Sequence, residues 1–212
     1  MKTRFKSIMS HIPLISNKTK LLISASLVIF AFIIFCINPN RLDSQLCLAA
    51  MLFSFLGDVS LNCMPLHKRP HWLLYIGAAF FMVSHLQYAV AYYLLIFESN
   101  NVFFNLGASI ATTFMVLLFL VSAVFTFLTK SKTHPMTLIV FGLYTLIIGI
   151  NFVTIYSYSW SFGSAAFVGA LSFLISDFII GIETIFKVKN ETLRKLVWIF
   201  YPIGQILIIA CH

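Results

Sequence analysis

The chain has 212 residues, enough for one domain or two small ones. Hydrophobic residues make up 60% and charged residues 9% of it, whereas soluble domains carry about 25% charged residues. The mean hydropathy is +0.98. These values exclude a soluble enzyme, a disordered tail and a coiled coil, and they leave a polytopic α-helical membrane protein. The long unbroken apolar runs also argue against a transmembrane barrel, whose strands alternate polar and apolar residues.

The net charge is +8, from 14 Lys and Arg against 6 Asp and Glu. The basic residues lie between the apolar runs and not together on one face of a folded domain. They therefore predict membrane topology and give no reason to expect a nucleic-acid partner. The cysteines form no CxxC pair, and we expect them to be small buried apolar residues without disulfides or zinc. They are Cys36, Cys47, Cys63 and Cys211.

Seven apolar runs approach the length of about 20 residues with which a helix crosses a hydrocarbon core of about 30 Å. The predicted spans are Leu21–Ile37, Gln45–Leu61, Trp72–Phe97, Val102–Leu128, Met136–Tyr156, Trp160–Ile182 and Leu193–Cys211. Proline, asparagine or charged residues separate most of them. The break between the fifth and the sixth span is the weakest, because residues 157–161 offer only serines and aromatic residues.

The distribution of positive charge predicts the orientation of the spans. With seven spans and a cytoplasmic N-terminus, 13 of the 14 basic residues fall on the cytoplasmic side, and only Arg41 falls outside. The sequence thus predicts an all-α, polytopic transmembrane helical bundle of about seven spans. A basic cytoplasmic segment, residues 1–20, precedes a single transmembrane domain, residues 21–212. We expect this bundle to lie in a lipid bilayer, the bacterial cytoplasmic membrane.

Two carboxylates lie inside predicted spans, Asp58 in the second and Asp177 in the sixth. A charged side chain at the centre of a spanning helix costs about 2.5–3.5 kcal/mol on insertion scales, so such residues usually face the bundle interior and mark a site. Each Asp lies ten residues before a cytoplasmic lysine, and Gln205 lies ten residues after one on a span of opposite direction. Ten helical residues rise about 15 Å. We therefore expect these three side chains at one level, with His85 somewhat deeper.

Helical spacing brings further polar residues next to these. Ser54, Asp58 and Asn62 form one stripe at steps of four, and His85 and Tyr88 belong to another in the third span. Each residue alone has a structural interpretation: a serine or tyrosine that packs, a hydrogen-bonded core histidine, or a carboxylate that clasps two helices. Two carboxylates at one depth, with His, Tyr and Gln nearby, favour a functional site.

Several other classes of membrane protein are not indicated. The seventh span has no internal lysine of the kind that holds retinal. A catalytic zinc takes about three protein ligands, and His85 is the only histidine inside a predicted span. HExxH and GxSxG motifs are absent. We therefore expect neither a metal nor another cofactor.

Four blocks follow one another in the chain: FSFLGDVSL at 53–61, GAAFFMVSHLQY at 77–88, FVGALSFLISD at 167–177 and YPIGQILI at 201–208. In this order they resemble the signatures SLLGDxxL, GxxxFxxxHxxY, GAxLFxxSD and YxxxQxLI of the lysoplasmalogenase (YhhN-like) family of multi-pass membrane hydrolases. The resemblance covers Lys18 to the end of the chain. Members of this family commonly have eight spans, and here the first 17 residues are polar and basic, so we expect one span fewer.

The resemblance implies hydrolysis of the vinyl-ether bond of lysoplasmalogens, which are lysophospholipids, to a fatty aldehyde and glycerophospho-ethanolamine or -choline. Protonation of the β-carbon of a vinyl ether gives an oxocarbenium ion, to which water then adds. Glycosidases handle a similar cation with two carboxylates in different environments. We expect Asp58 and Asp177 to form this catalytic pair, and His85 and Tyr88 to orient water or the leaving glycerol oxygen.

Further polar residues are expected to bind the substrate. Gln205 and Asn62 would hydrogen-bond the glycerophosphate, and Tyr201 and Ser54 complete the predicted binding residues. Two other functions stay open: a proton-coupled transporter of a small molecule or lipid, since paired carboxylates also serve as proton relays, and a non-catalytic lipid-binding protein. A closed-ended pocket with a polar base would favour the enzyme, and a path to both faces would favour the transporter.

Overall fold

The computed structural model describes residues 15–63, 70–98, 110, 112, 135–185 and 190–212. The long helices in these ranges are α2 (Asn17–Ile37), α3 (Leu42–Asn62), α4 (His71–Glu98), α6 (Pro135–Phe162), α7 (Ser164–Ile185) and α8 (Glu191–Ile209). All six are long and apolar enough to cross a membrane. This confirms the predicted all-α transmembrane bundle. The predicted fourth span, residues 102–128, lies outside the described residues except for 110 and 112.

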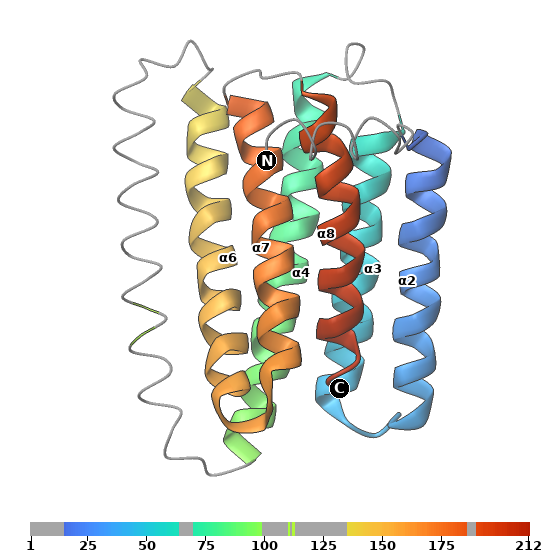
Figure 1. The fold of residues 1–212 in the computed structure, drawn as a ribbon, viewed down its shortest axis with the longest axis vertical. Coiled ribbons are helices and arrows are strands. Elements are labelled where there is room, and N and C mark those ends of the chain that lie inside the picture. The colour runs from blue at the N-terminus through green and yellow to red at the C-terminus, as the bar shows by residue number, and fades with distance from the viewer. Residues whose placement is uncertain (1–14, 64–69, 99–109, 111, 113–134, 186–189) are drawn as a thin grey trace, which may run out of the picture.

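The six helices form a closed ring (Figure 1). Each packs against the next in the order α2, α3, α4, α6, α7 and α8, and α8 returns to α2. Helices joined by a short connection run antiparallel, whereas α4 and α6 run in the same direction. Accordingly, the Tyr75 hydroxyl near the start of α4 lies 3.0 Å from the Thr137 hydroxyl near the start of α6. Side chains from all six helices therefore meet inside one ring.

Side-chain caps fix the beginnings of two helices. The Ser16 hydroxyl accepts a hydrogen bond from the backbone N–H of Thr19 at 3.1 Å and begins α2. The Asn190 side chain accepts one from the backbone N–H of Thr192 at 2.9 Å and begins α8. Both caps satisfy N–H groups that have no partner within the first helical turn.

The boundary between α6 and α7 lies at Gly163, so the break predicted at residues 157–161 is wrong. Gly163 has a φ of 122°, a conformation that glycine adopts readily and other residues rarely do. Ser157 and Ser159 instead lie inside α6, where their hydroxyls donate to the carbonyls of Val153 and Ile155. A serine that bonds the carbonyl four residues earlier fits within a helix and does not end it.

The helices bury polar, aromatic and small side chains inside the ring and expose many other large apolar side chains on its outer surface. This is the distribution expected of a protein that lipid surrounds. Cys47 is buried, but Cys36 and Cys63 are exposed, so the expectation that all four cysteines are buried is wrong for these two. Their small apolar side chains can lie on an outer surface without an energetic penalty from lipid.

Candidate functional site

Most of the polar residues singled out in the sequence meet inside the ring, in three hydrogen-bonded groups. We name each group after one member. The Asp177 group is Asn151, His85 and Asp177; the Asp58 group is Ser24, Asp58 and Tyr201; the Gln205 group is Ser54, Ser84, Tyr88 and Gln205.

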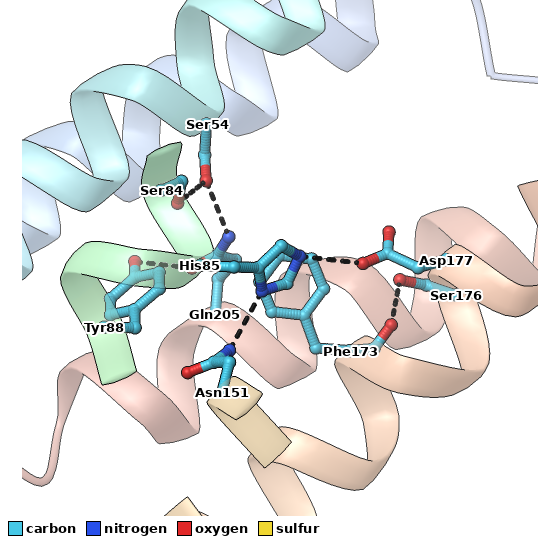
Figure 2. A network of polar contacts seen from close by, with 9 residues as sticks. All are labelled: Ser54, Ser84, His85, Tyr88, Asn151, Phe173, Ser176, Asp177 and Gln205. Atoms are coloured by element: carbon cyan, nitrogen blue, oxygen red, sulfur yellow. Dashed lines mark hydrogen bonds and ion pairs between the residues drawn. The ribbon is translucent and has the colours of Figure 1, made fainter. Parts of the chain in front are cut away.

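His85 of α4 joins α6 and α7 in the Asp177 group (Figure 2). Its Nε2 lies 3.1 Å from Oδ2 of Asp177, and its Nδ1 lies 2.9 Å from Nδ2 of Asn151. An amide nitrogen can only donate. With the Asn151 amide in this orientation, Nδ1 is the acceptor, and His85 carries its proton on Nε2, where it donates to the Asp177 carboxylate. If the Asn151 amide were turned over, its oxygen would require the proton on Nδ1 of His85. The unprotonated Nε2 and the Asp177 carboxylate, both acceptors, would then face each other.

The Asp177 group is buried and packed against aromatic rings. His85 is 1% exposed, Asn151 4% and Asp177 7%. The ring of Phe173 lies 4.6 Å from the imidazole, centroid to centroid, and that of Tyr144 lies 5.8 Å away, edge-on. These two rings pack against the imidazole and restrict its orientation toward Asp177. Buried polar groups of this kind are stable only when they are hydrogen-bonded.

Asp58 of α3 has different partners. Its Oδ2 accepts hydrogen bonds from the Ser24 hydroxyl of α2 and from the Tyr201 hydroxyl of α8, the latter at 2.7 Å. Both bonds end on the same oxygen, which leaves Oδ1 as the oxygen that can carry a proton. The two carboxyl groups therefore differ: Asp177 has an imidazole donor besides the Tyr144 hydroxyl, whereas Asp58 has two hydroxyl groups and no imidazole.

The Gln205 group links α3, α4 and α8. The Tyr88 hydroxyl donates to Oε1 of Gln205 at 2.7 Å, and Nε2 of Gln205 donates to the Ser54 hydroxyl at 3.2 Å. The hydroxyls of Ser54 and Ser84 lie 2.7 Å apart. Both ends of the Gln205 amide are thus satisfied although the residue is fully buried, and the group fastens three helices together (Figure 2).

The count of residues from the loop lysines predicts Gln205 at the level of Asp58. The structure places the two side chains at different levels. Its partner on α3 is Ser54, one helical turn from Asp58, and the partner of Asp58 on α8 is Tyr201, one turn from Gln205. Counting residues from a loop ignores the offset of one helix along its neighbour. That offset amounts here to one turn, about 5.4 Å.

Asn62 lies apart from the three groups. Its side-chain nitrogen donates to the backbone carbonyl of Asp58 at 2.9 Å, and its own carbonyl accepts a hydrogen bond from Nδ2 of Asn17 at 3.0 Å. Asn62 thereby ties the end of α3 to the start of α2. Its predicted contact with the substrate stays a prediction.

An apolar pocket between α4, α6 and α7 leads inward to Asp177. Hydroxyl groups of Tyr75, Thr137 and Thr184 lie at its outer end, near the start of α4 and α6 and the end of α7. Asp177 and Tyr144 lie at its inner end. Seven residues separate the two ends on both α6 and α7, so the pocket is about 10 Å deep at 1.5 Å per residue.

Phe81 separates this pocket from Asp58. Its ring lines the pocket on one side and lies edge-on to Tyr201 on the other, with 6.4 Å between centroids. The ring packs where Gly57 has no side chain; a Cβ there would lie 2.7 Å from it. Asp177 therefore faces the pocket directly, whereas Asp58 lies behind Phe81 and Tyr201.

A further polar cluster lies at the opposite end of the bundle. Two nitrogen atoms of Arg41 donate to Asp43 at 3.1 Å each, and Nδ1 of His212 lies 3.2 Å from the same carboxylate. The hydrogen bond with Asp43 raises the pKa of the Arg41 guanidinium above its usual value. This cluster joins the start of α3 to the residues after α8, and it is remote from the pocket.

Sequence reasoning missed Ser24, Ser84, Tyr144 and Asn151. Asn151 carried the same signal as Gln205, an amide inside a predicted span, and could have been found on that ground. Ser24 and Ser84 are single hydroxyls among many, and nothing in the sequence distinguishes them from packing residues. Within the described ranges, no three His, Cys, Asp or Glu side chains lie together as ligands for a metal ion.

A ring of apolar helices around buried carboxyl groups, a histidine and an amide defines an integral, polytopic membrane protein with an internal polar site. A model of the YhhN family matches residues 18–211. The chain therefore belongs to the YhhN family, which confirms the resemblance found in the four sequence blocks. No curated protein and no solved structure matches the chain.

Proposed function

We propose that this protein hydrolyses the vinyl-ether bond of lysoplasmalogens to a fatty aldehyde and a glycerophospho-alcohol. The observation that carries the proposal is a buried carboxylate, Asp177, with its imidazole partner His85 at the inner end of an apolar pocket. Membership of the YhhN family supports it. We further propose the bacterial cytoplasmic membrane as its location, on the ground of the charge asymmetry of the loops.

The pocket suits the hydrocarbon chain of a single-chain lipid. Apolar side chains such as Leu74, Val140 and Ile180 dominate its wall, and the carboxyl group lies at one end. An alkenyl chain in this pocket would bring its first carbons, which belong to the vinyl ether, to Asp177. A lipid with two chains would need a second apolar channel beside it.

The hydrogen bonds favour a division of roles between the two carboxyl groups. Asp177 accepts the Nε2–H of His85, and this hydrogen bond stabilises the ionised carboxylate. We therefore assign to Asp177 the stabilisation of the oxocarbenium ion and the activation of water. Asp58 binds hydroxyl groups through Oδ2 alone, so we assign the transferable proton to its Oδ1. Pairs of acids with different environments divide such roles in glycosidases.

The proposed reaction needs only the substrate and water. Asp58 protonates the β-carbon of the vinyl ether, and the positive charge develops on the α-carbon and the ether oxygen. Water attacks the α-carbon while Asp177 takes its proton, which gives a hemiacetal. The hemiacetal C–O bond then breaks: Asp177 donates the proton that it took from water to the departing glycerol oxygen, and the hemiacetal hydroxyl passes its proton to Asp58, which restores both acids. The products are an aldehyde and an alcohol.

Contact with both acids requires a movement of Phe81. Its ring stands between the pocket and Tyr201, the hydroxyl partner of Asp58. A rotation of the Phe81 side chain would join the pocket to the Asp58 group, and the aromatic rings of Phe173 and Tyr201 would then adjoin the cation. Aromatic faces attract cations.

A proton-coupled transporter is the main alternative. Among the described residues, those that line the pocket reach from one end of α4, α6 and α7 to Asp177. A pocket with a carboxyl group at its inner end supports an enzyme, whereas a transporter needs a path toward both faces of the membrane.

Bond selectivity tests the proposed function. Purified protein is incubated with lysolipids of equal chain length that carry a vinyl-ether, an alkyl-ether or an acyl linkage, and the release of aldehyde or fatty acid is measured. Only the vinyl ether forms the oxocarbenium ion by protonation at carbon, so only aldehyde release is expected. Comparable release of fatty acid from the acyl lysolipid would contradict the proposal, because ester hydrolysis calls for a nucleophile or activated water and an oxyanion hole.

A further inference from the structure

We propose that Phe141 of α6 and Gly181 of α7 set the width of the apolar pocket and thereby determine which hydrocarbon chains it accepts. Both residues line the pocket between its two ends. The inference rests on the proposed function and deepens it, because it names the residues that contact the chain and the carbons that pass them.

The Phe141 ring packs against α7 at a position that has no side chain. A Cβ on Gly181 would lie 2.5 Å from Cε2 of Phe141 and 3.2 Å from its Cζ, and such distances are too short for carbon atoms that are not bonded. Gly181 thus provides the space that the ring occupies beside the α7 backbone. The ring in this position leaves the rest of the pocket to a hydrocarbon chain.

A methyl group on Gly181 would displace the ring without separating the helices. The atoms that it meets belong to the far end of a side chain, which can rotate, whereas a Cβ on Gly204 meets backbone atoms of Phe173 and Gly169. Close packing between helices leaves a displaced ring little other space. We therefore expect Gly181→Ala to retain the fold and to move the Phe141 ring into the pocket that it lines.

The ring lies about one helical turn from the proposed reaction centre. Gly181 follows Asp177 by four residues along α7, which is about 6 Å. With ordinary carbon bond lengths and angles, about five carbons of an extended chain span this distance. A chain whose first carbon lies at Asp177 would therefore pass the Phe141 ring near its fifth carbon.

A small residue of α4 lines the pocket at the same level. The Tyr75 and Thr137 hydroxyls lie 3.0 Å apart where α4 and α6 begin, and the two helices run in the same direction (Figure 1). Ala78 follows Tyr75 by three residues and lines the pocket. Phe141 follows Thr137 by four residues, so Ala78 and Phe141 both lie about one turn inward from this contact. A larger side chain at position 78 would narrow the pocket where a displaced Phe141 ring does.

Chain length separates the part of the pocket beyond the ring from the part at Asp177. A butyl chain ends before the Phe141 ring, whereas an octyl chain passes it and fills the depth of about 10 Å. Each methylene that enters an apolar pocket strengthens binding about fourfold, so the four additional methylenes should strengthen it about 10²-fold. The ratio of the two affinities therefore measures the outer part of the pocket alone.

Binding of saturated ether lipids tests the pair separately from catalysis. The ligands are 1-butyl and 1-octyl ether lysophosphoethanolamines, which cannot follow the vinyl-ether reaction. The proteins, in lipid nanodiscs, are the wild type, Gly181→Ala, Phe141→Leu and the variant with both changes. Gly142→Ala is the matched control, because no atom of the described residues would lie within 4 Å of its Cβ. Dissociation constants are measured by calorimetry, with the butyl lipid as a competitor of the octyl lipid.

We expect the wild type to bind the octyl lipid about 10²-fold more tightly than the butyl lipid. Gly181→Ala should weaken octyl binding at least ~10-fold and leave butyl binding unchanged, because the displaced ring meets only the longer chain. In the Phe141→Leu background the same change should have no effect, since the ring is gone. Gly142→Ala should affect neither lipid.

Ala78→Leu narrows the same level of the pocket from α4 and should also weaken octyl binding alone. This variant decides the test if Gly181→Ala does not fold. Equal affinity of the wild type for the two lipids would overturn the inference. So would equal weakening of both lipids by Gly181→Ala, no weakening of either, or the same loss with and without the Phe141 ring.

Aldehyde release distinguishes failure of this inference from failure of the proposed function. A wild type that binds the octyl lipid selectively but releases no aldehyde from the corresponding vinyl-ether lipid would refute the proposed function and leave the assignment of the pocket intact. Aldehyde release with the same dependence on chain length in the wild type and in Gly181→Ala would refute the role of the pair and leave the proposed function intact.

Discussion

At the scale of single residues, Asp58 and Asp177 differ in the groups that hydrogen-bond them. Asp177 receives an imidazole N–H from His85, whereas Asp58 receives two hydroxyl groups on one oxygen. Isolated buried carboxylates would be costly. These partners let the ring hold two acids in its interior, and in the proposed reaction they divide the proton-transfer steps between the two acids.

Neutral substitution of either acid should abolish most of the activity. Asp58→Asn and Asp177→Asn keep the shape of the side chain and remove the ionisable group, so we expect each to lower turnover at least ~10²-fold, the low end for a positioned acid or base. Aldehyde release from a vinyl-ether lysolipid is the measurement. Ser26→Ala, on the exposed side of α2, serves as the control. Full activity in either Asn variant would remove that residue from the mechanism.

Asn151 is a positioning residue in this scheme, because its side-chain amide hydrogen-bonds His85 and acts on Asp177 only through that imidazole. Asn151→Asp would replace the amide donor by a carboxylate acceptor and draw the histidine proton to Nδ1, away from Asp177. We expect turnover to fall at least ~10-fold and the nitrogen NMR signals of His85 to change to those of the other tautomer. If Asn151→Asp left both the tautomer and the rate unchanged, the role of Asn151 would be structural only.

At the scale of helices, close approach of α7 and α8 sets the position of the site. Asp177 lies on α7 and Tyr201 on α8, and glycines face each other between them. A Cβ on Gly204 would lie 2.9 Å from the backbone nitrogen of Phe173 and 3.0 Å from the carbonyl oxygen of Gly169. Small residues at such interfaces allow helices in membranes to pack closely.

A methyl group at this interface should separate the two helices. We expect Gly204→Ala to destabilise the folded protein by about 1–3 kcal/mol, since backbone atoms cannot give way as a flexible side chain can. Gly142→Ala is the matched control: it lies in α6, where no atom of the described residues would lie within 4 Å of its Cβ, and the helix gains up to about 1 kcal/mol from the substitution. Thermal unfolding in detergent compares the two. Equal stability of both variants would mean that the interface is looser than described.

At the scale of the whole molecule, the positions of the charged residues on the bundle agree with the orientation predicted from the loops. The basic residues of α2 and α8 lie at the end of the bundle where both helices begin (Figure 1). The Arg41 and Asp43 pair lies at the other end.

Reporter fusions test this orientation. A reporter after His212 should be active outside the cytoplasm, and one at Lys189 should be active inside it, because 13 of the 14 basic residues then lie on the cytoplasmic side. Alkaline phosphatase and green fluorescent protein report the two compartments. A cytoplasmic reporter after His212 would mean that the number of spans differs by one from the prediction.

The sequence by itself determined the class of fold, the family and the residue types of the site. Apolar runs, their boundaries and the rarity of carboxylates inside them follow from the cost of polar groups in lipid, which acts on each helix separately. Asp58, Asp177 and His85 could therefore be identified from their own helices. The boundary between α6 and α7 was misplaced because its signal is conformational: the φ of 122° at Gly163 leaves no trace in hydropathy.

Only the tertiary structure decided which of these residues are partners. His85 bonds Asp177 and Asn151, Asp58 bonds Ser24 and Tyr201, and Gln205 bonds residues one turn away from the level predicted for it. Helical periodicity fixes positions within one helix but not the shift or rotation of a helix against its neighbour. Those are set by contacts between helices, such as the approach of Gly204 to Gly169, which no single segment of the sequence contains.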